Sequence, residues 1–279
     1  MSAMFSECLS FGGLGLRISG ETPWQLSPVC APFRTAGESA EHEIYVAISS
    51  ALPTPPENAV SSRGCYRWRC GAERHMLHDN SFNTSYSVTK GNVTELILSP
   101  HYAENLRTQL ILEEADLFDV LAAHGMLVLH SSYALRAEGD AILFSGVSGA
   151  GKSTQAELWH EYAAARVING DRTLIDVNRG MAHGIFYSGT SGICENYSAP
   201  IRAIVLPEQA GENSVTAAGH REAFMRLINQ CAYYPWDADS ASEMTELVAR
   251  LVGRVPVYRL RCRKDEGAVR ALENELRRE

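Results

Sequence analysis

The residues best suited to chemistry lie in one glycine-rich segment. Residues 146–153 read Gly-Val-Ser-Gly-Ala-Gly-Lys-Ser and match the phosphate-binding pattern G-x-x-x-x-G-K-[ST] at every fixed position. Glycines let backbone N–H groups turn toward phosphate oxygens. Lys152 is expected to reach the β- and γ-phosphates, and the Ser153 hydroxyl to hold Mg²⁺. The segment therefore predicts a site for ATP or another nucleoside triphosphate. The residues expected to bind the nucleotide are Gly146, Ser148, Gly149, Ala150, Gly151, Lys152, Ser153 and Thr154.

The flanking segments suit this interpretation. Residues 141–145 form a short apolar run typical of a buried strand, and residues 154–164 are rich in helix formers. Strand, loop and helix is the context that the pattern requires, and a helix N-terminus attracts anions by itself. The alternative is a glycine-rich turn without a ligand.

An acidic residue is expected close to the loop, since a bound triphosphate needs a metal partner. Asp171 follows the apolar run that begins at Val167, where its carboxylate can point back at the loop and position Mg²⁺ together with Ser153. The alternative is that Asn169-Gly-Asp171 is the turn of a β-hairpin.

Several segments together resemble the catalytic domain of the HPr kinase/phosphorylase family, over roughly residues 125–262. They are His130-Ser-Ser, a hairpin, the loop Gly146–Thr154, a helix, and Val-Ile-Asn-Gly-Asp-Arg ending at Arg172. The resemblance implies a phosphoenolpyruvate-carboxykinase-like fold, a mixed β structure with a phosphate loop. It also implies a kinase that acts on serine, either in a protein or peptide or as the free amino acid.

The resemblance also assigns roles to single residues. The tandem aspartates of the family become Gly170-Asp171 here, so one carboxylate is missing, and Arg172 matches the arginine of the family. If Asp171 holds the metal, the base must be His130 or Glu195. For these two residues a core histidine and an ordinary loop acid are the alternatives. Residues 189–196 resemble a divergent form of the second glycine-rich loop of the family.

The chain divides by pattern into two parts. Residues 1–100 form short strand-like segments broken by turns and predict a small β-rich N-terminal domain, whereas residues 101–279 contain the loop and predict the catalytic domain. Between residues 165 and 206 there is no helical period, and a βαβ unit needs a crossover of a dozen or more residues, which argues against the usual parallel nucleotide-kinase or GTPase topology. The fold class expected is α+β or mixed α/β.

Most of the expected elements follow from periodicity and turn residues. Helices are predicted at about 103–124, 154–164, 220–230, 240–252 and 265–278. In the C-terminal part, strands are predicted at 126–132, 141–145, 166–169, 173–177, 184–187, 201–206 and 255–262.

Composition limits the class of protein. The 279 residues are 45% hydrophobic and 21% charged, which is ordinary for a globular protein, and the net charge of −8 argues against a dedicated nucleic-acid binder. No apolar run is long enough to span a membrane. The first seven residues lack the basic region of a signal peptide, so we expect a cytoplasmic protein. Seven scattered cysteines are expected to be plain thiols.

The function expected is an ATP- and Mg²⁺-dependent kinase whose partner is a peptide, a protein or a small hydroxyl-bearing acceptor. We expect no nucleic acid, no membrane and possibly a homo-oligomer. The N-terminal domain would recognise the acceptor, with a peptide adding to an exposed sheet edge. Two alternatives stay open: a nucleotide-binding regulatory protein without transfer activity, and a carboxykinase-type phosphotransferase for a small carboxylic acid.

Overall fold

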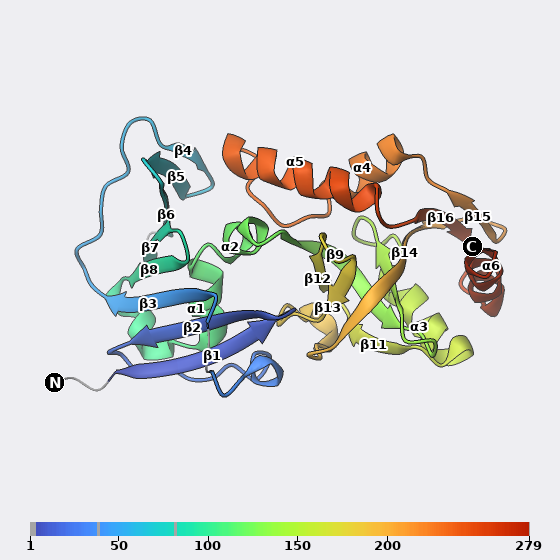
Figure 1. Cartoon of the computed structure of the whole chain (residues 1–279), viewed down its shortest axis with the longest axis horizontal. Helices are drawn as coiled ribbons and strands as arrows, with labels where there is room; N and C mark the ends of the chain where they lie inside the picture. Colours follow the sequence, from blue (N-terminus) through green and yellow to red (C-terminus); the bar gives the residue numbers. More distant parts are fainter. Residues whose placement is uncertain (1–3, 38–39, 81–82, 279) are drawn as a thin grey trace. The chain divides into compact units, whose positions relative to one another are not determined.

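The computed structural model of the chain describes residues 4–37, 40–80 and 83–278 (Figure 1). It forms two compact units. Unit 1 comprises Met1–Val120 and Tyr234–Ala241, and unit 2 comprises Leu121–Tyr233 and Ser242–Glu279. The expectation that the first seven residues are not a signal peptide falls partly on residues 1–3, which lie outside the described residues. No helix among the described residues is long and apolar enough to cross a membrane.

Unit 1 is built on an eight-stranded mixed sheet with the strand order β1-β2-β3-β8-β7-β6-β5-β4. Strand β3 pairs in parallel with β2 and with β8, and the other neighbours are antiparallel. In β2 the buried Leu14, Leu16 and Ile18 alternate with less buried residues, as in a sheet with one face on the core. The strands are β1 Phe5–Phe11, β2 Leu14–Gly20, β3 His42–Ile48, β4 Val60–Ser62, β5 Cys65–Cys70, β6 Glu73–Asp79, β7 Thr84–Lys90 and β8 Val93–Leu98.

The helix predicted over residues 103–124 is wrong as one element. The chain forms the 3₁₀ helix η2 (Pro100–Asn105), then α1 (Thr108–Glu114) and α2 (Leu117–Ala123). The break comes at Asp116, whose φ of 56° ends the helical path. Its carboxylate lies 2.9 Å from the Arg67 guanidinium, which also pairs with Asp119. A buried arginine on β5 therefore breaks a helix that periodicity alone predicts as continuous.

The segment 234–241 joins unit 1 through the same arginine. Asp237 Oδ2 lies 2.6 Å from Arg67 Nε, and the Tyr234 ring centroid lies 4.0 Å from the guanidinium carbon. Ser240 donates a hydrogen bond to Asp119. Three carboxylates around one buried cation thus join parts of the chain that are more than a hundred residues apart in sequence.

Unit 2 contains a five-stranded β-barrel. Strands β10, β9, β12, β13 and β14 pair in that order, and β10 also pairs in parallel with β14, which closes the ring. Strand β11 pairs with β9, and β16 and β15 extend the sheet beyond β14. The strands are β9 Met126–Leu135, β10 Ala141–Ser145, β11 Arg166–Asn169, β12 Arg172–Asp176, β13 Met181–His183, β14 Ser198–Gln209, β15 Ser214–Ala217 and β16 Val257–Cys262.

The strand residues of unit 2 are buried on both faces, since helices cover them. In β10, Ala141 and Leu143 pack in one apolar cluster, while Ile142 and Phe144 pack in another. Residues of α4 and α5 belong to the first cluster, and residues of α3 and α6 belong to the second. A continuous apolar run is the pattern of such a strand. The helices, labelled in Figure 1, are α3 Lys152–Ala163, α4 His220–Ile228, α5 Ala238–Val252 and α6 Glu266–Leu276.

The expectation of a mixed α/β protein is confirmed, with an eight-stranded sheet near the N-terminus followed by a barrel with helices. One strand prediction is wrong: the strand before β14 is Met181–His183 rather than 184–187. A Cβ on Gly184 would clash with the Glu195 carbonyl oxygen, so a glycine is required where β13 ends. Strands β1, β4 and β15 were not predicted from the sequence.

Candidate functional site

The glycine loop lies between β10, which ends at Ser145, and α3, which begins at Lys152. Gly149 and Gly151 have φ values of 80° and 102°, a region that favours glycine. Lys152 Nζ donates hydrogen bonds to the carbonyl oxygens of Gly146 (2.9 Å) and Val147 (3.2 Å). The ammonium thus lies over the first half of the loop, and its burial lowers the pKa of Lys152.

Asp171 lies at an interruption between two strands that pair with the same partner. Asn169 of β11 pairs opposite Tyr133, and Arg172 of β12 pairs opposite His130, both antiparallel to β9. The hairpin interpretation of Asn-Gly-Asp is therefore wrong, because β11 and β12 follow one another along β9 instead of pairing together. The Ser131 N–H donates to the Asp171 carbonyl oxygen at 3.0 Å and holds the interruption in register.

Three predicted site residues meet here. Asp171 Oδ1 lies 3.5 Å from His130 Nε2, and Asp171 Oδ2 lies 3.6 Å from Arg172 Nε. The pKa of His130 is lowered, first by its burial and then by the nearby Lys152 ammonium, although Asp171 opposes the shift. Because the pKa of His130 lies below its usual value, the imidazole is neutral at pH 7 and can accept a proton.

Asn169 was not singled out in the sequence, yet it orients this acid. Its Oδ1 accepts the N–H groups of Asp171 and Arg172, both at 3.0 Å, and its Nδ2 donates to the Ile185 carbonyl oxygen at 2.7 Å. The side chain is fully buried. Asparagine before Gly-Asp often bonds to local backbone in this way, so a signal was present in the sequence, where a hairpin turn was the alternative to a metal-binding acid.

The second glycine-rich segment packs directly on this acid. A Cβ added to Gly189, in the 3₁₀ turn η3 (Gly189–Ser191), would lie 2.6 Å from the Asp171 Cβ. A Cβ added to Gly170 would lie 2.1 Å from Ser191 Oγ. Ser191 itself is held by a 2.7 Å hydrogen bond to the Ser188 carbonyl oxygen. The space beside Gly170 is therefore filled by the Ser191 side chain.

Glu195, the other candidate base, makes different contacts. Its Oε2 lies 3.5 Å from Arg166 Nη2, and its side chain is 45% exposed. The Arg166 guanidinium also stacks 4.6 Å from the Tyr197 ring centroid. Of the two candidate bases, His130 lies next to Asp171, whereas Glu195 pairs with Arg166.

The donors at the loop suit a magnesium ion that is bound mainly through phosphates. Ser153 is an exposed hydroxyl in the first turn of α3. The Asp171 oxygens lie 3.5 Å from His130 Nε2 and 3.6 Å from Arg172 Nε, beyond the usual hydrogen-bond length, which leaves them able to accept other donors or a metal ion. Within the described ranges, no group of three His, Cys, Asp or Glu residues could hold a metal by itself. Mg²⁺ in nucleotide sites typically takes one or two protein ligands, with phosphates and waters completing the set. Ser153 and Asp171 fit that requirement.

Two clefts flank the glycine loop. The first, of about 460 Å³, touches Gly146 and Val147 and continues to Met225 and Gln230. The second, of about 380 Å³, touches Gly151 and Thr154 where α3 begins. The loop thus has open space at each of its ends.

Comparison of the sequence with models of protein families and with curated proteins finds no match. The assignment of a function to this site therefore rests on the residues and their geometry.

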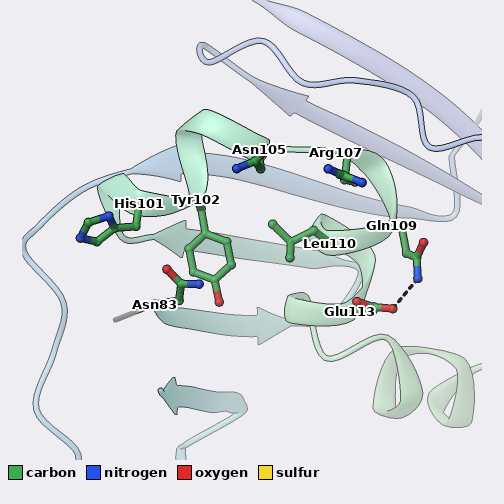
Figure 2. A pocket seen from close by; sticks show the side chains of 8 residues that line it. All are labelled: Asn83, His101, Tyr102, Asn105, Arg107, Gln109, Leu110 and Glu113. Atoms are coloured by element: carbon green, nitrogen blue, oxygen red, sulfur yellow. Dashed lines mark hydrogen bonds between the residues drawn. The ribbon is translucent and has the colours of Figure 1, made fainter. Parts of the chain in front are cut away.

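Unit 1 has a hollow of its own, of about 360 Å³, shown in Figure 2. The Tyr102 ring and Leu110 give it an apolar wall, with Asn83 and Arg107 among its polar residues. None of the residues that the sequence assigned to catalysis or nucleotide binding lines it. The β1 edge of the sheet is partly paired already, because the Thr35 N–H donates to the Cys8 carbonyl oxygen at 2.9 Å.

Proposed function

We propose that the chain is an ATP- and Mg²⁺-dependent kinase of the HPr-kinase-like type. It transfers a phosphoryl group to a hydroxyl, with serine in a peptide or protein, or free serine, as the acceptor. The observation that carries the proposal is that His130 Nε2, on strand β9, lies 3.5 Å from Asp171 Oδ1, and that β9 pairs with β10 up to Ser145, the residue before the glycine loop.

In this proposal the loop amides and Lys152 hold the β- and γ-phosphates. Ser153 and Asp171 hold Mg²⁺, which neutralises charge on the phosphates when it is bound. The neutral imidazole of His130 takes the proton of the acceptor hydroxyl as its oxygen bonds to the γ-phosphorus. The bond from that phosphorus to the bridging oxygen breaks, and its electron pair leaves on ADP. Arg172 lies where it can balance charge on the transferred group.

The cleft at Gly146 supplies room for the acceptor. Lys152 Nζ lies at this end of the loop, and lysines of such loops contact the β- and γ-phosphates. Val147 and Met225 are 66% and 55% exposed at this cleft. Exposed apolar side chains next to the transferred phosphate suit an acceptor that is part of a peptide chain.

A transfer assay tests the proposal. The protein is incubated with γ-labelled ATP and Mg²⁺, alone, with L-serine, and with serine-containing peptides encoded beside its gene. Lys152→Ala is the inactive variant, and Lys90→Ala is the matched control, because Lys90 makes only an exposed ion pair with Glu73. We expect label in an acceptor with wild type and Lys90→Ala, and at least a hundredfold less with Lys152→Ala.

A regulatory protein that binds ATP without transferring phosphate is the second candidate. Gly170 stands where the family that the chain resembles has an aspartate. The Ser191 side chain fills the space that a side chain at position 170 would need. Binding of ATP that depends on Lys152, with no label in any acceptor, would favour this candidate. Absence of ATP binding in the wild type would contradict both.

A further inference from the structure

We propose that the hollow of unit 1 binds a free α-amino acid with an apolar side chain. The hollow, of about 360 Å³, is lined by residues of η2 and α1 and by Asn83, the residue before β7 (Figure 2). Its volume lies within the range of about 300–1,000 Å³ that small-molecule pockets span. All of its lining residues belong to unit 1 and none belongs to the glycine loop, so this site is independent of the proposed kinase activity.

Two opposite charges line the hollow without neutralising each other. Arg107 precedes α1 and Glu113 lies near its end, and both side chains are exposed. Within the described part of the chain, neither makes an ion pair. Glu113 Oε1 accepts a hydrogen bond from Gln109 Nε2 at 2.9 Å, which leaves the second carboxylate oxygen able to accept another donor. A ligand that carries both a carboxylate and an ammonium group complements this pair of charges.

The order of the side chains along α1 gives the orientation of such a ligand. Arg107, Leu110 and Glu113 recur every three residues, so they follow one side of the helix with Leu110 in the middle. The helical rise separates the backbone at residues 107 and 113 by about 9 Å, which leaves room for a ligand between the two charges. The ligand carboxylate pairs with Arg107, its ammonium group pairs with Glu113, and its side chain lies over Leu110.

The apolar wall of the hollow is held in place by a hydrogen-bond network. Tyr102 lines the hollow together with Leu110 (Figure 2). The Tyr102 hydroxyl donates to Glu114 Oε1 at 3.1 Å. The other oxygen of Glu114 lies 2.8 Å from His78 Nδ1 and accepts a hydrogen bond from Ser85. An aromatic wall that is already fixed adds contact area at little ordering cost, which favours a ligand with an apolar side chain.

Titration calorimetry with the full chain tests the proposal. The ligands are L-phenylalanine and L-leucine, the N-acetyl derivative of each, which lacks the ammonium group, and the amide of each, which lacks the carboxylate. We expect at least one of the two amino acids to bind with a Kd below about 1 mM, and its two derivatives to bind about tenfold more weakly or worse. L-alanine should also bind about tenfold more weakly, because it leaves the wall formed by Tyr102 and Leu110 uncovered.

Two variants separate the contributions of the two charges. Arg107→Gln should weaken binding of the amino acid about tenfold and bind the amide as well as the amino acid. Glu113→Gln should weaken it to a similar extent and bind the N-acetyl derivative as well as the amino acid. Arg221→Gln and Glu57→Gln are the matched controls, because both residues are exposed and lie outside the hollow, and they should behave like the wild type.

The wild type alone can overturn the proposal. Absence of binding of both amino acids up to about 5 mM would do so, as would equal binding of the amino acid and its two derivatives. Unchanged binding of all ligands in Arg107→Gln and Glu113→Gln, with melting temperatures like that of the wild type, would place any bound amino acid elsewhere and would also overturn it. If either variant unfolds, the comparison of ligands with the wild type still decides.

Discussion

At the scale of single residues, His130 and Asp171 decide what the glycine loop can do. The loop alone indicates phosphate binding, but transfer to a hydroxyl also needs a group that accepts a proton. His130 lies opposite Arg172 on the neighbouring strand, and its Nε2 lies 3.5 Å from the Asp171 carboxylate. Burial and the Lys152 ammonium lower its pKa, which keeps the imidazole neutral at pH 7. In the proposed kinase, His130 therefore supplies the proton acceptor, although one of the tandem acids of the family that the chain resembles is absent.

The pH dependence of transfer tests this role. Because the neutral imidazole is the active form, kcat should fall as pH drops through a pKa below 6.5. His130→Gln should remove this acid limb and lower kcat about 10²- to 10⁴-fold. The measurement is the initial rate of label transfer from pH 5 to 8. His220→Gln is the control, at an exposed position at the start of α4. It should keep the wild-type kcat and the same fall of kcat at low pH. An unchanged acid limb in His130→Gln would point to Asp171 as the base instead.

At the scale of elements, the second glycine-rich turn and the β11–β12 interruption form one packed unit. Gly189 lies against Asp171, and Ser191 lies against Gly170, each closer than a Cβ would allow. The Gly170 N–H donates to the Ile193 carbonyl oxygen at 3.3 Å, so backbone bonding also joins the two segments. The glycines at 170 and 189 are thus required by close contact, and the position of Asp171 depends on the turn η3.

Restoring an acid at position 170 should therefore fail by itself. Gly170→Asp must displace Ser191, and overpacking of this kind costs about 1–3 kcal/mol. We expect a lower melting temperature and a lower transfer rate than in the wild type. The double variant Gly170→Asp/Ser191→Gly removes the obstructing side chain and should recover most of the stability. Ser191→Gly alone is the control for loss of the hydroxyl. A Gly170→Asp protein as stable as the wild type would contradict the packing argument.

At the scale of the whole molecule, the contacts of Arg67 join the segment 234–241 to the N-terminal part of the chain in unit 1. It neutralises Asp116 and Asp119 after α1 and Asp237 in the segment that follows Tyr233. The Arg67, Asp116 and Asp119 side chains are each at most 5% exposed. Burial raises the pKa of Asp116, next to the second acid Asp119, while Arg67 lowers it. The arginine thus pairs with three carboxylates and brings the segment 234–241 into unit 1.

Replacing Arg67 by methionine tests this arrangement. Loss of the cation leaves buried carboxylates unpaired, which should cost about 3–5 kcal/mol near pH 7.5. Arg74 Nη1, 3.9 Å from Asp119, is the remaining nearby cation. Without Arg67 the pKa of Asp116 rises further, so the folded state binds more protons than the unfolded state and the loss should shrink as pH falls to 5.5.

Urea unfolding of Arg67→Met at the two pH values measures this effect. Arg69→Met on the same strand breaks only an exposed pair with Asp239 and should cost less than about 1 kcal/mol at both. An equal loss at pH 5.5 and pH 7.5 in Arg67→Met would show that the carboxylates are not the source of the destabilisation.

Much of unit 2 could be predicted because its signals are local. The apolar run before Gly146, the helix formers after Ser153 and the absence of a helix between residues 165 and 206 each depend on neighbours in sequence. Strand β9 and the three C-terminal helices were predicted to within a few residues at most ends. The break in the predicted helix 103–124 was missed, because its cause is an arginine about fifty residues away.

The sequence by itself determined the phosphate-loop pattern, the mixed α/β class and the candidate residues, because each of these depends on residue type and short spacing. Only the tertiary structure decided which candidates meet. Pairing of β11 and β12 with β9 brings Asp171 to His130, and the contact with Arg166 keeps Glu195 elsewhere. The tertiary structure also decided that the Ser191 side chain fills the space beside Gly170. These facts concern distances between residues far apart in the chain, and local spacing carries no information about such distances.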